Sequence, residues 1–190
     1  VGKISPQCGR AAMEWVTKAG ELALVGTVAA LATAPLNKGA ASLAGDQSIG
    51  HMELLQELSG AKTVATMLMT KNLRVVHLTT HRSLRLACDY VKKERILQFL
   101  QLTHDSFVKW GIDRPSIGVA ALNPHGSDGG LMGNEEAEEI SPAVVAAQEQ
   151  GIDAVGPVPA DTIFHQATGG RYDVVLAMFH DQGHIPVKVY

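Results

Sequence analysis

The stretch YDVVLAMFH, residues 172–180, is an apolar run that ends on a histidine. Two other runs share this form: LRVVHLTTH, residues 73–81, and PSIGVAALNPH, residues 115–125. Short apolar runs rich in Val, Ile and Leu are typical of strands buried in a parallel sheet. Segments with helical spacing of apolar residues lie between them, and such alternation favours a mostly parallel sheet with helices on its faces. The sequence therefore predicts an α/β fold.

Further elements are expected on either side of these runs. Lys71-Asn72 separates two β-rich runs and resembles a tight hairpin connection. We expect helices over residues 6–18, after Lys38, after Gly50, over 83–111 as one helix or two, and over 135–151 with a break at Pro142, and strands over 22–33 and at the chain's last residues.

The histidines that end the three runs are His81, His125 and His180. The carboxyl ends of parallel strands share one edge of a sheet, so three imidazoles delivered there could converge. Imidazole suits Zn and related divalent ions, and three protein ligands with an open position are typical of a catalytic metal site. Each histidine could instead be a hydrogen-bonded loop residue. His77 and His104 lack this placement and are expected to be structural.

Other polar groups lie beside these strand ends. The loop NPHGSDGGLMGNEE, residues 123–136, surrounds His125 with four glycines, more than a surface turn needs. Asp181 could ligate a metal, act as a general base, orient His180, or form an Asx-type turn. At a predicted helix start, Gly50-His51 could bind an anion through backbone N–H groups, or His51 could be a poor helix cap.

Composition excludes some classes of partner. The chain has 46% hydrophobic and 18% charged residues and a net charge of −3. Without a basic stretch, nucleic acid and anionic membranes are not expected as main partners. No run is long enough to span a bilayer. Cys8 and Cys88 are isolated, which fits free thiols in a reducing compartment, the cytoplasm by default.

Both ends of the chain resemble cuts in a longer sequence, so residues 1–190 are expected to be its central part. The segment ending in Val187 and Val189 is predicted to be a strand with no following helix to cover it. Missing segments or a second subunit would then bury its apolar face.

Taken together, these motifs resemble the PdxA family. The stretches that carry the resemblance span residues 33 to 188 in order: TAPLNKGA, GHMELL, TTHRSLR, LNPHGSDGGLMGNEE, GPVPADTIF and AMFHDQGHIPVK. The resemblance implies a two-lobed α/β/α sandwich of the isocitrate/isopropylmalate dehydrogenase type, here incomplete, with uncertain lobe boundaries and a habit of forming homodimers.

The resemblance also implies an activity: NAD- or NADP-linked oxidation and decarboxylation of 4-hydroxythreonine 4-phosphate, D-threonate 4-phosphate or D-erythronate 4-phosphate. It implies that His81, His125 and His180 hold a divalent ion, such as Zn, Mg, Mn, Co or Ni. It assigns the phosphorylated substrate to His51, with its neighbour Met52, and to Lys188. Asp181 and Lys38 are the candidates for proton transfer. The residues that bind the cofactor are not identified.

Two departures separate this chain from the usual family pattern. Met52 stands where the family commonly has threonine, so a hydroxyl donor is absent there. HDQGHIPVK, residues 180–188, resembles the threonate and erythronate branch more than the vitamin B6 branch. Two other functions stay open: a metal-dependent hydrolase, since three histidines can also activate water, and a non-catalytic protein that binds a phosphorylated metabolite.

Overall fold

The computed structural model describes residues 2–45 and 50–190, and the chain divides into two compact units, Val1–Val64 and Ala65–Tyr190. The first unit consists of α1 (Pro6–Leu24), α2 (Lys38–Leu43) and α3 (His51–Ser59). α1 begins where the Ser5 side chain accepts a hydrogen bond from Cys8 N. It packs against α2 so closely that a Cβ on Gly9 would lie 2.8 Å from Ala41 N.

The second unit is built on a five-stranded sheet in the order β1-β2-β5-β3-β4. β1 pairs antiparallel with β2, and the other neighbours are parallel. The strands are β1 (Thr66–Thr70), β2 (Leu73–His77), β3 (Ile117–Ala120), β4 (Ala154–Val158) and β5 (Val174–Ala177). The parallel α/β prediction and the hairpin at Lys71-Asn72 are therefore confirmed.

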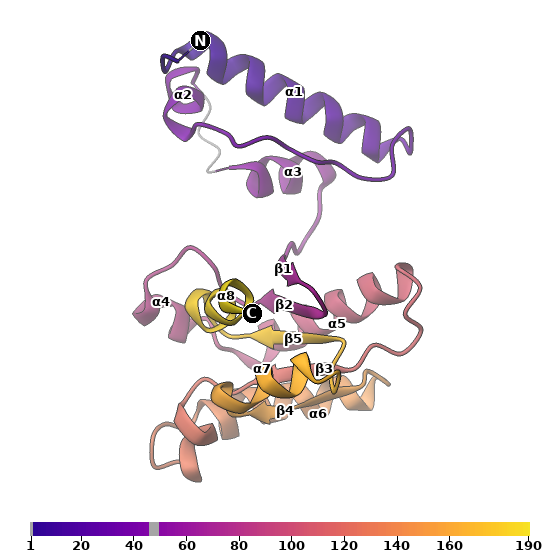
Figure 1. Ribbon diagram of the computed structural model, residues 1–190, viewed down its shortest axis with the longest axis vertical. Helices are drawn as coiled ribbons and strands as arrows, with labels where there is room; N and C mark the ends of the chain where they lie inside the picture. Colours follow the sequence, from indigo (N-terminus) through magenta and orange to yellow (C-terminus); the bar gives the residue numbers. More distant parts are fainter. Residues whose placement is uncertain (1, 46–49) are drawn as a thin grey trace. The chain divides into compact units, whose positions relative to one another are not determined.

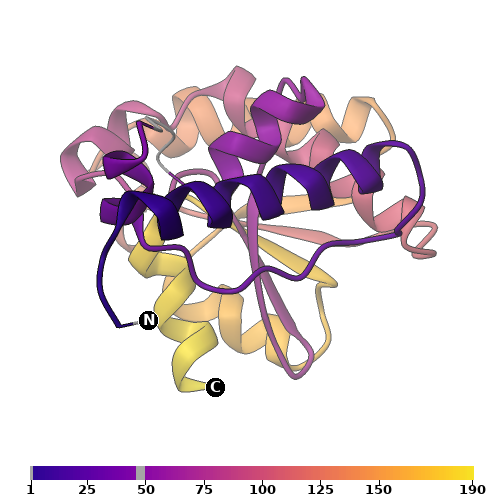
Figure 2. The same cartoon turned by 90° about the horizontal axis from the view of Figure 1, so that it is seen from above.

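Helices cover both faces of this sheet. The helical elements are α4 (Leu84–Asp89), α5 (Lys93–Lys109), η1 (Pro124–Asp128), η2 (Glu136–Ile140), α6 (Ser141–Glu149), α7 (Ala160–Thr168) and α8 (His180–Val189). Figures 1 and 2 show α7 and α8 on one side of the strands and α5 and α6 on the other. Side chains that alternate along the strands follow the same division: Val76 packs with Phe99 of α5, and Val75 with Ile163 of α7. The second unit is thus a three-layer α/β/α arrangement.

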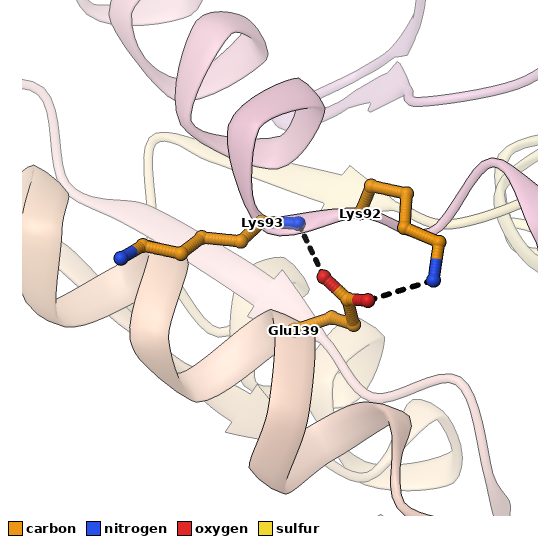
Figure 3. A network of polar contacts seen from close by, with 3 residues as sticks. All are labelled: Lys92, Lys93 and Glu139. Atoms are coloured by element: carbon orange, nitrogen blue, oxygen red, sulfur yellow. Dashed lines mark hydrogen bonds and ion pairs between the residues drawn. The ribbon is translucent and has the colours of Figure 1, made fainter.

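One carboxylate joins α5 to the helix pair η2–α6. Glu139, at the end of η2, accepts hydrogen bonds from the backbone N–H of Lys93 at 2.8 Å and from the Lys92 ammonium at 2.7 Å (Figure 3). α5 has no side-chain cap at its own N-cap residue. Glu139 therefore supplies from another element the acceptor that a helix start requires.

Two predicted strands are wrong. Over residues 22–33, α1 continues to Leu24, Gly26 then adopts a positive φ of 74°, and the rest is mostly exposed chain without strand pairing. The segment after β5 is the helix α8, not a strand. Gly183 and Val187, four residues apart, are buried, and four residues separate neighbours on one helix face. Among the described residues, no helix is long and apolar enough to cross a bilayer.

Candidate functional site at the carboxyl edge of the sheet

The four parallel strands of the second unit deliver their following segments to one edge of the sheet. Beyond β2 the chain reaches His81, beyond β3 it reaches His125, beyond β4 it reaches Asp161, and beyond β5 it reaches His180. This is the edge at which ligands bind in open parallel sheets. The topology thus carries all three candidate histidines to the predicted edge.

His81 and His180 lie side by side, with ring centroids 5.8 Å apart. This spacing is close to the roughly 5–6 Å expected for two imidazoles on one ion, given metal–nitrogen bonds of about 2.0–2.1 Å. His180 Nδ1 lies 2.6 Å from Oδ1 of Asp181. A carboxylate on one ring nitrogen fixes the tautomer and the orientation of a ligand histidine. The geometry of Asp181 thus matches the orienting role considered for it.

Two further histidines continue this row of rings. His184 stacks on His180 at 3.6 Å and contacts His77, at 4.5 Å between centroids. Burial of its ring lowers the pKa of His184. His77 is buried in β2, and burial lowers its pKa to about 4. Burial thus favours the neutral form of both imidazoles. His77, within a strand of the sheet, has the surroundings of a structural residue.

His125 lies in a strained turn. His125, Ser127 and Asp128 have φ values of 53°, 69° and 45°, in the left-handed region that residues other than glycine rarely adopt. Such strain persists only where surrounding contacts hold the backbone, and it clusters at functional sites. The contacts here come from the far end of the loop.

Glu136 is the main anchor of this loop. Its side chain is buried, and Oε1 accepts hydrogen bonds from the backbone N–H groups of Leu122 and Asn123 at 2.8 and 2.7 Å. Asn123 Nδ2 donates to Oε2 of Glu136 at 2.9 Å and to Glu135 at 2.8 Å. The hydrogen bond from Asn123 helps to lower the pKa of the Glu135 carboxyl, after its own backbone N–H. These hydrogen bonds join the end of the loop to its beginning, on either side of His125.

A cavity of about 650 Å³ opens beside these residues. His125 and Asp181 both line it, which brings these two predicted residues to one site. Its walls are mainly apolar side chains from the segment that follows β3, from α7 and from α8, with a few polar groups, as in most small-molecule sites. Sequence reasoning missed Asp161 and Phe164, which line the cavity from α7. The segment GPVPADTIF was noted only as a resemblance, because AVGPV lacks the continuous apolar run that marks the other strands.

The other predicted substrate-binding and proton-transfer residues do not line this cavity. Lys188 lies exposed in the last turn of α8, not on a strand. In the first unit, Lys38 begins α2 and its side chain reaches the start of α3: a Cβ on Gly50 would lie 3.8 Å from Lys38 Cε. His51 begins α3, and its buried Nε2 has no hydrogen-bond partner within residues 2–45 and 50–190. Met52 follows it and is 38% exposed.

Within residues 2–45 and 50–190, no group of three or more His, Cys, Asp or Glu side chains is arranged to hold a metal ion. His81 and His180 approach each other as two ligands would, and His125 stands at the same edge. The three-histidine metal site therefore stays a prediction.

The fold and site define an α/β protein with a cavity at the carboxyl ends of parallel strands. A model of the family described as pyridoxal phosphate biosynthetic protein PdxA matches residues 1–190. The chain belongs to the PdxA family.

Relatives of this chain carry dehydrogenase names. The D-threonate 4-phosphate dehydrogenase of Salmonella typhimurium (strain LT2) is 44% identical over 188 residues, with 99% of this chain and 58% of that protein covered. The 4-hydroxythreonine-4-phosphate dehydrogenase of Geobacter metallireducens is 46% identical over 181 residues, with 95% and 53% covered.

Solved structures agree with these sequence matches. The crystal structure of a 4-hydroxythreonine-4-phosphate dehydrogenase from Klebsiella pneumoniae superposes with a TM-score of 0.95 at 45% identity, over 99% of this chain and 57% of that one. The chain spans about 57% of the length of the curated relatives it matches, such as that of Fusobacterium nucleatum.

Proposed function

We propose that the protein oxidises a 4-phosphorylated hydroxy acid with NAD or NADP and a divalent metal ion, and that decarboxylation follows. The observation that carries this proposal is the match of 99% and 95% of the chain, at 44% and 46% identity, to relatives named D-threonate 4-phosphate dehydrogenase and 4-hydroxythreonine-4-phosphate dehydrogenase. D-threonate 4-phosphate and D-erythronate 4-phosphate are the favoured substrates, and 4-hydroxythreonine 4-phosphate is the third.

His81, His125 and His180 would hold the metal ion. Neutral imidazoles suit such an ion, and the spacing of His81 and His180 supports a shared one. The chemistry that a bound divalent ion supplies is polarisation of the substrate's hydroxyl oxygen and then of its carbonyl oxygen. Asp181 holds the ring of His180 through Nδ1.

Oxidation removes a hydride from the substrate carbon to NAD or NADP and a proton from the hydroxyl to a base. Loss of CO₂ then requires a proton donor. Lys38 and Asp181 are the candidates for these transfers. His51, whose buried Nε2 has no hydrogen-bond partner among the described residues, would donate to a phosphate or carboxylate oxygen, and Lys188 would add a positive charge. Met52 offers the substrate no hydroxyl.

The protein is further proposed to act in the cytoplasm as a homodimer. Cys8 and Cys88 are free thiols, which suits a reducing compartment. Ile185 and Val189 of α8, which also line the cavity, are 58% and 80% exposed, and a second subunit or further segments of the protein would cover this apolar surface. Light scattering of the natural protein tests the dimer.

The test of function is NADH or NADPH formation by the natural protein with each of the three phosphorylated acids and with Zn²⁺, Mg²⁺, Mn²⁺, Co²⁺ or Ni²⁺. Cofactor reduction with release of CO₂ supports the proposal. Phosphate release without cofactor would favour a metal-dependent hydrolase instead. Tight substrate binding without turnover would favour a non-catalytic binding protein.

A further inference from the structure

Gln182 connects two strand ends that are far apart in sequence. It lies in the first turn of α8, and only 9% of it is exposed. Its Oε1 accepts a hydrogen bond from Met178 N, just beyond β5, at 2.7 Å. Its Nε2 donates to the carbonyl of Ala121, just beyond β3, also at 2.7 Å. The side chain thus bridges the neighbouring strands where both leave the sheet.

The two bridged segments carry the candidate site. Two residues beyond Met178 stands His180, and four residues beyond Ala121 stands His125. Strand pairing holds β3 and β5 in register only as far as Val119 and Leu176. Beyond that point the bond from Gln182 to Ala121 replaces the ladder and ties the two segments together.

Two other side chains form hydrogen bonds to the same two segments. The Thr79 hydroxyl, beyond β2, donates to the carbonyl of Met178 at 2.9 Å. Glu136 holds Leu122 and Asn123, as described above. Gln182 differs from these two because it joins the segment of His125 to that of His180. An amide is suited to this position, since it donates and accepts at once.

We propose that Gln182 is a positioning residue that sets the place of the His125 loop relative to His180 and Asp181. This inference rests on the proposed function for its catalytic consequence. Gln182 also lines the cavity, but both ends of its amide are already bonded to backbone groups. It therefore acts through its neighbours and not on a ligand.

Two variants of the natural protein test the two hydrogen bonds of the Gln182 side chain. Gln182→Glu keeps an acceptor for Met178 N and loses the donor to Ala121. Gln182→Met keeps the length of the side chain and loses both bonds. The matched control is Gln148→Met, because Gln148 also donates to a backbone carbonyl of the sheet, that of Ala154, at 2.8 Å, but at the amino end of β4.

The first readout is steady-state kinetics. Displacements of about 1 Å in a site lower rates by up to about a hundredfold. We expect kcat to fall by about tenfold to a hundredfold in both Gln182 variants, with the KM of the phosphorylated acid changed by less than about threefold. Gln148→Met should keep kcat within about twofold, since it lies away from this edge.

The second readout does not need turnover. Amide hydrogen exchange over residues 121–130 should be faster in both Gln182 variants and unchanged in Gln148→Met. Wild-type exchange there in the Gln182 variants would overturn the proposal, and so would a loss of kcat that merely follows lost stability in all three variants. If the wild type oxidises none of the acids, the proposed function fails, and the exchange measurement still decides the role of Gln182.

Discussion

Gly183 of α8 lies directly against the imidazole of His77 in β2. A Cβ on Gly183 would lie 2.8 Å from His77 Cδ2 and 2.8 Å from Val75 Cγ1, closer than side-chain atoms pack. The absence of a side chain at this position therefore sets how closely α8 approaches the sheet. The helix start that carries His180 depends on that approach.

Gly183→Ala should lower the free energy of unfolding by about 1–3 kcal/mol, because overpacking of a filled interior costs about that much. The matched control is Gly169→Ala, where φ is −77° and the nearest atom to a new Cβ lies at 3.4 Å. That change should stay within about 0.5 kcal/mol. Urea unfolding measures both, and equal stability of the two variants would show that α8 can move away freely.

His77 should make the protein less stable in acid. Its pKa is about 4 in the fold against 6.5 in the unfolded chain, so the unfolded chain binds the proton first as pH falls. Stability is therefore full above about pH 6.5 and declines toward pH 4, by about 3 kcal/mol at most. His77→Gln should flatten this decline in urea unfolding measured at several pH values. An unchanged slope in the variant would contradict the assignment.

Glu139→Ala should destabilise the second unit by about 1 kcal/mol, because it removes the acceptor at the start of α5. Lys92→Ala, which removes only an exposed partner, is the control and should cost less. The hydrogen bond from Lys92, and then that from Lys93 N–H, lowers the pKa of the Glu139 carboxyl. The stabilisation by Glu139 is therefore present above the pKa that its carboxyl has in the unfolded chain. It is lost as pH falls through the lower pKa that the carboxyl has in the folded protein. Thermal unfolding of both variants at neutral and acid pH measures this, and equal losses would contradict the capping role.

His125→Ala and His125→Gly should both lose turnover and bound metal and keep the fold. They should differ in stability, because φ at this position is 53° and only glycine adopts it without cost. The free energy of unfolding of His125→Gly should exceed that of His125→Ala by about 0.5–1 kcal/mol. Metal analysis and urea unfolding test the two parts separately. Wild-type metal content in either variant would remove His125 from the ligand set.

His51→Ala should raise the KM of the phosphorylated acid by about tenfold, the effect of losing about 1.4 kcal/mol of binding, with little change in the KM of NAD. The reason is the buried Nε2 at the start of α3, which has no hydrogen-bond partner in the part of the chain that the structure describes. Steady-state kinetics with each substrate varied in turn measures this. Equal increases in both KM values would indicate a general defect in folding.

Part of this protein could be read from its sequence. The runs ending at His81, His125 and His180 predicted the strands, because strands buried in a parallel sheet are typically apolar on both faces. Parallel strands all end on the same side of a sheet, so the sequence also predicted that the three histidines lie at one edge. The hairpin at Lys71-Asn72 followed from local turn chemistry. A short helix was predicted after the Pro/Asn/Gly loop at Lys38, and α2 begins at that residue.

The tertiary structure alone decided the rest. An apolar run such as residues 22–33 becomes a strand only where a partner strand offers hydrogen bonds, and the described chain has none for it. The segment 180–189 is a helix because Gly183 and Val187 find a sheet face to cover. The bond from Gln182 to Ala121 joins residues 61 positions apart, and no local pattern encodes it. Long-range contacts of this kind are set by how the elements pack, and they decide where the candidate histidines stand.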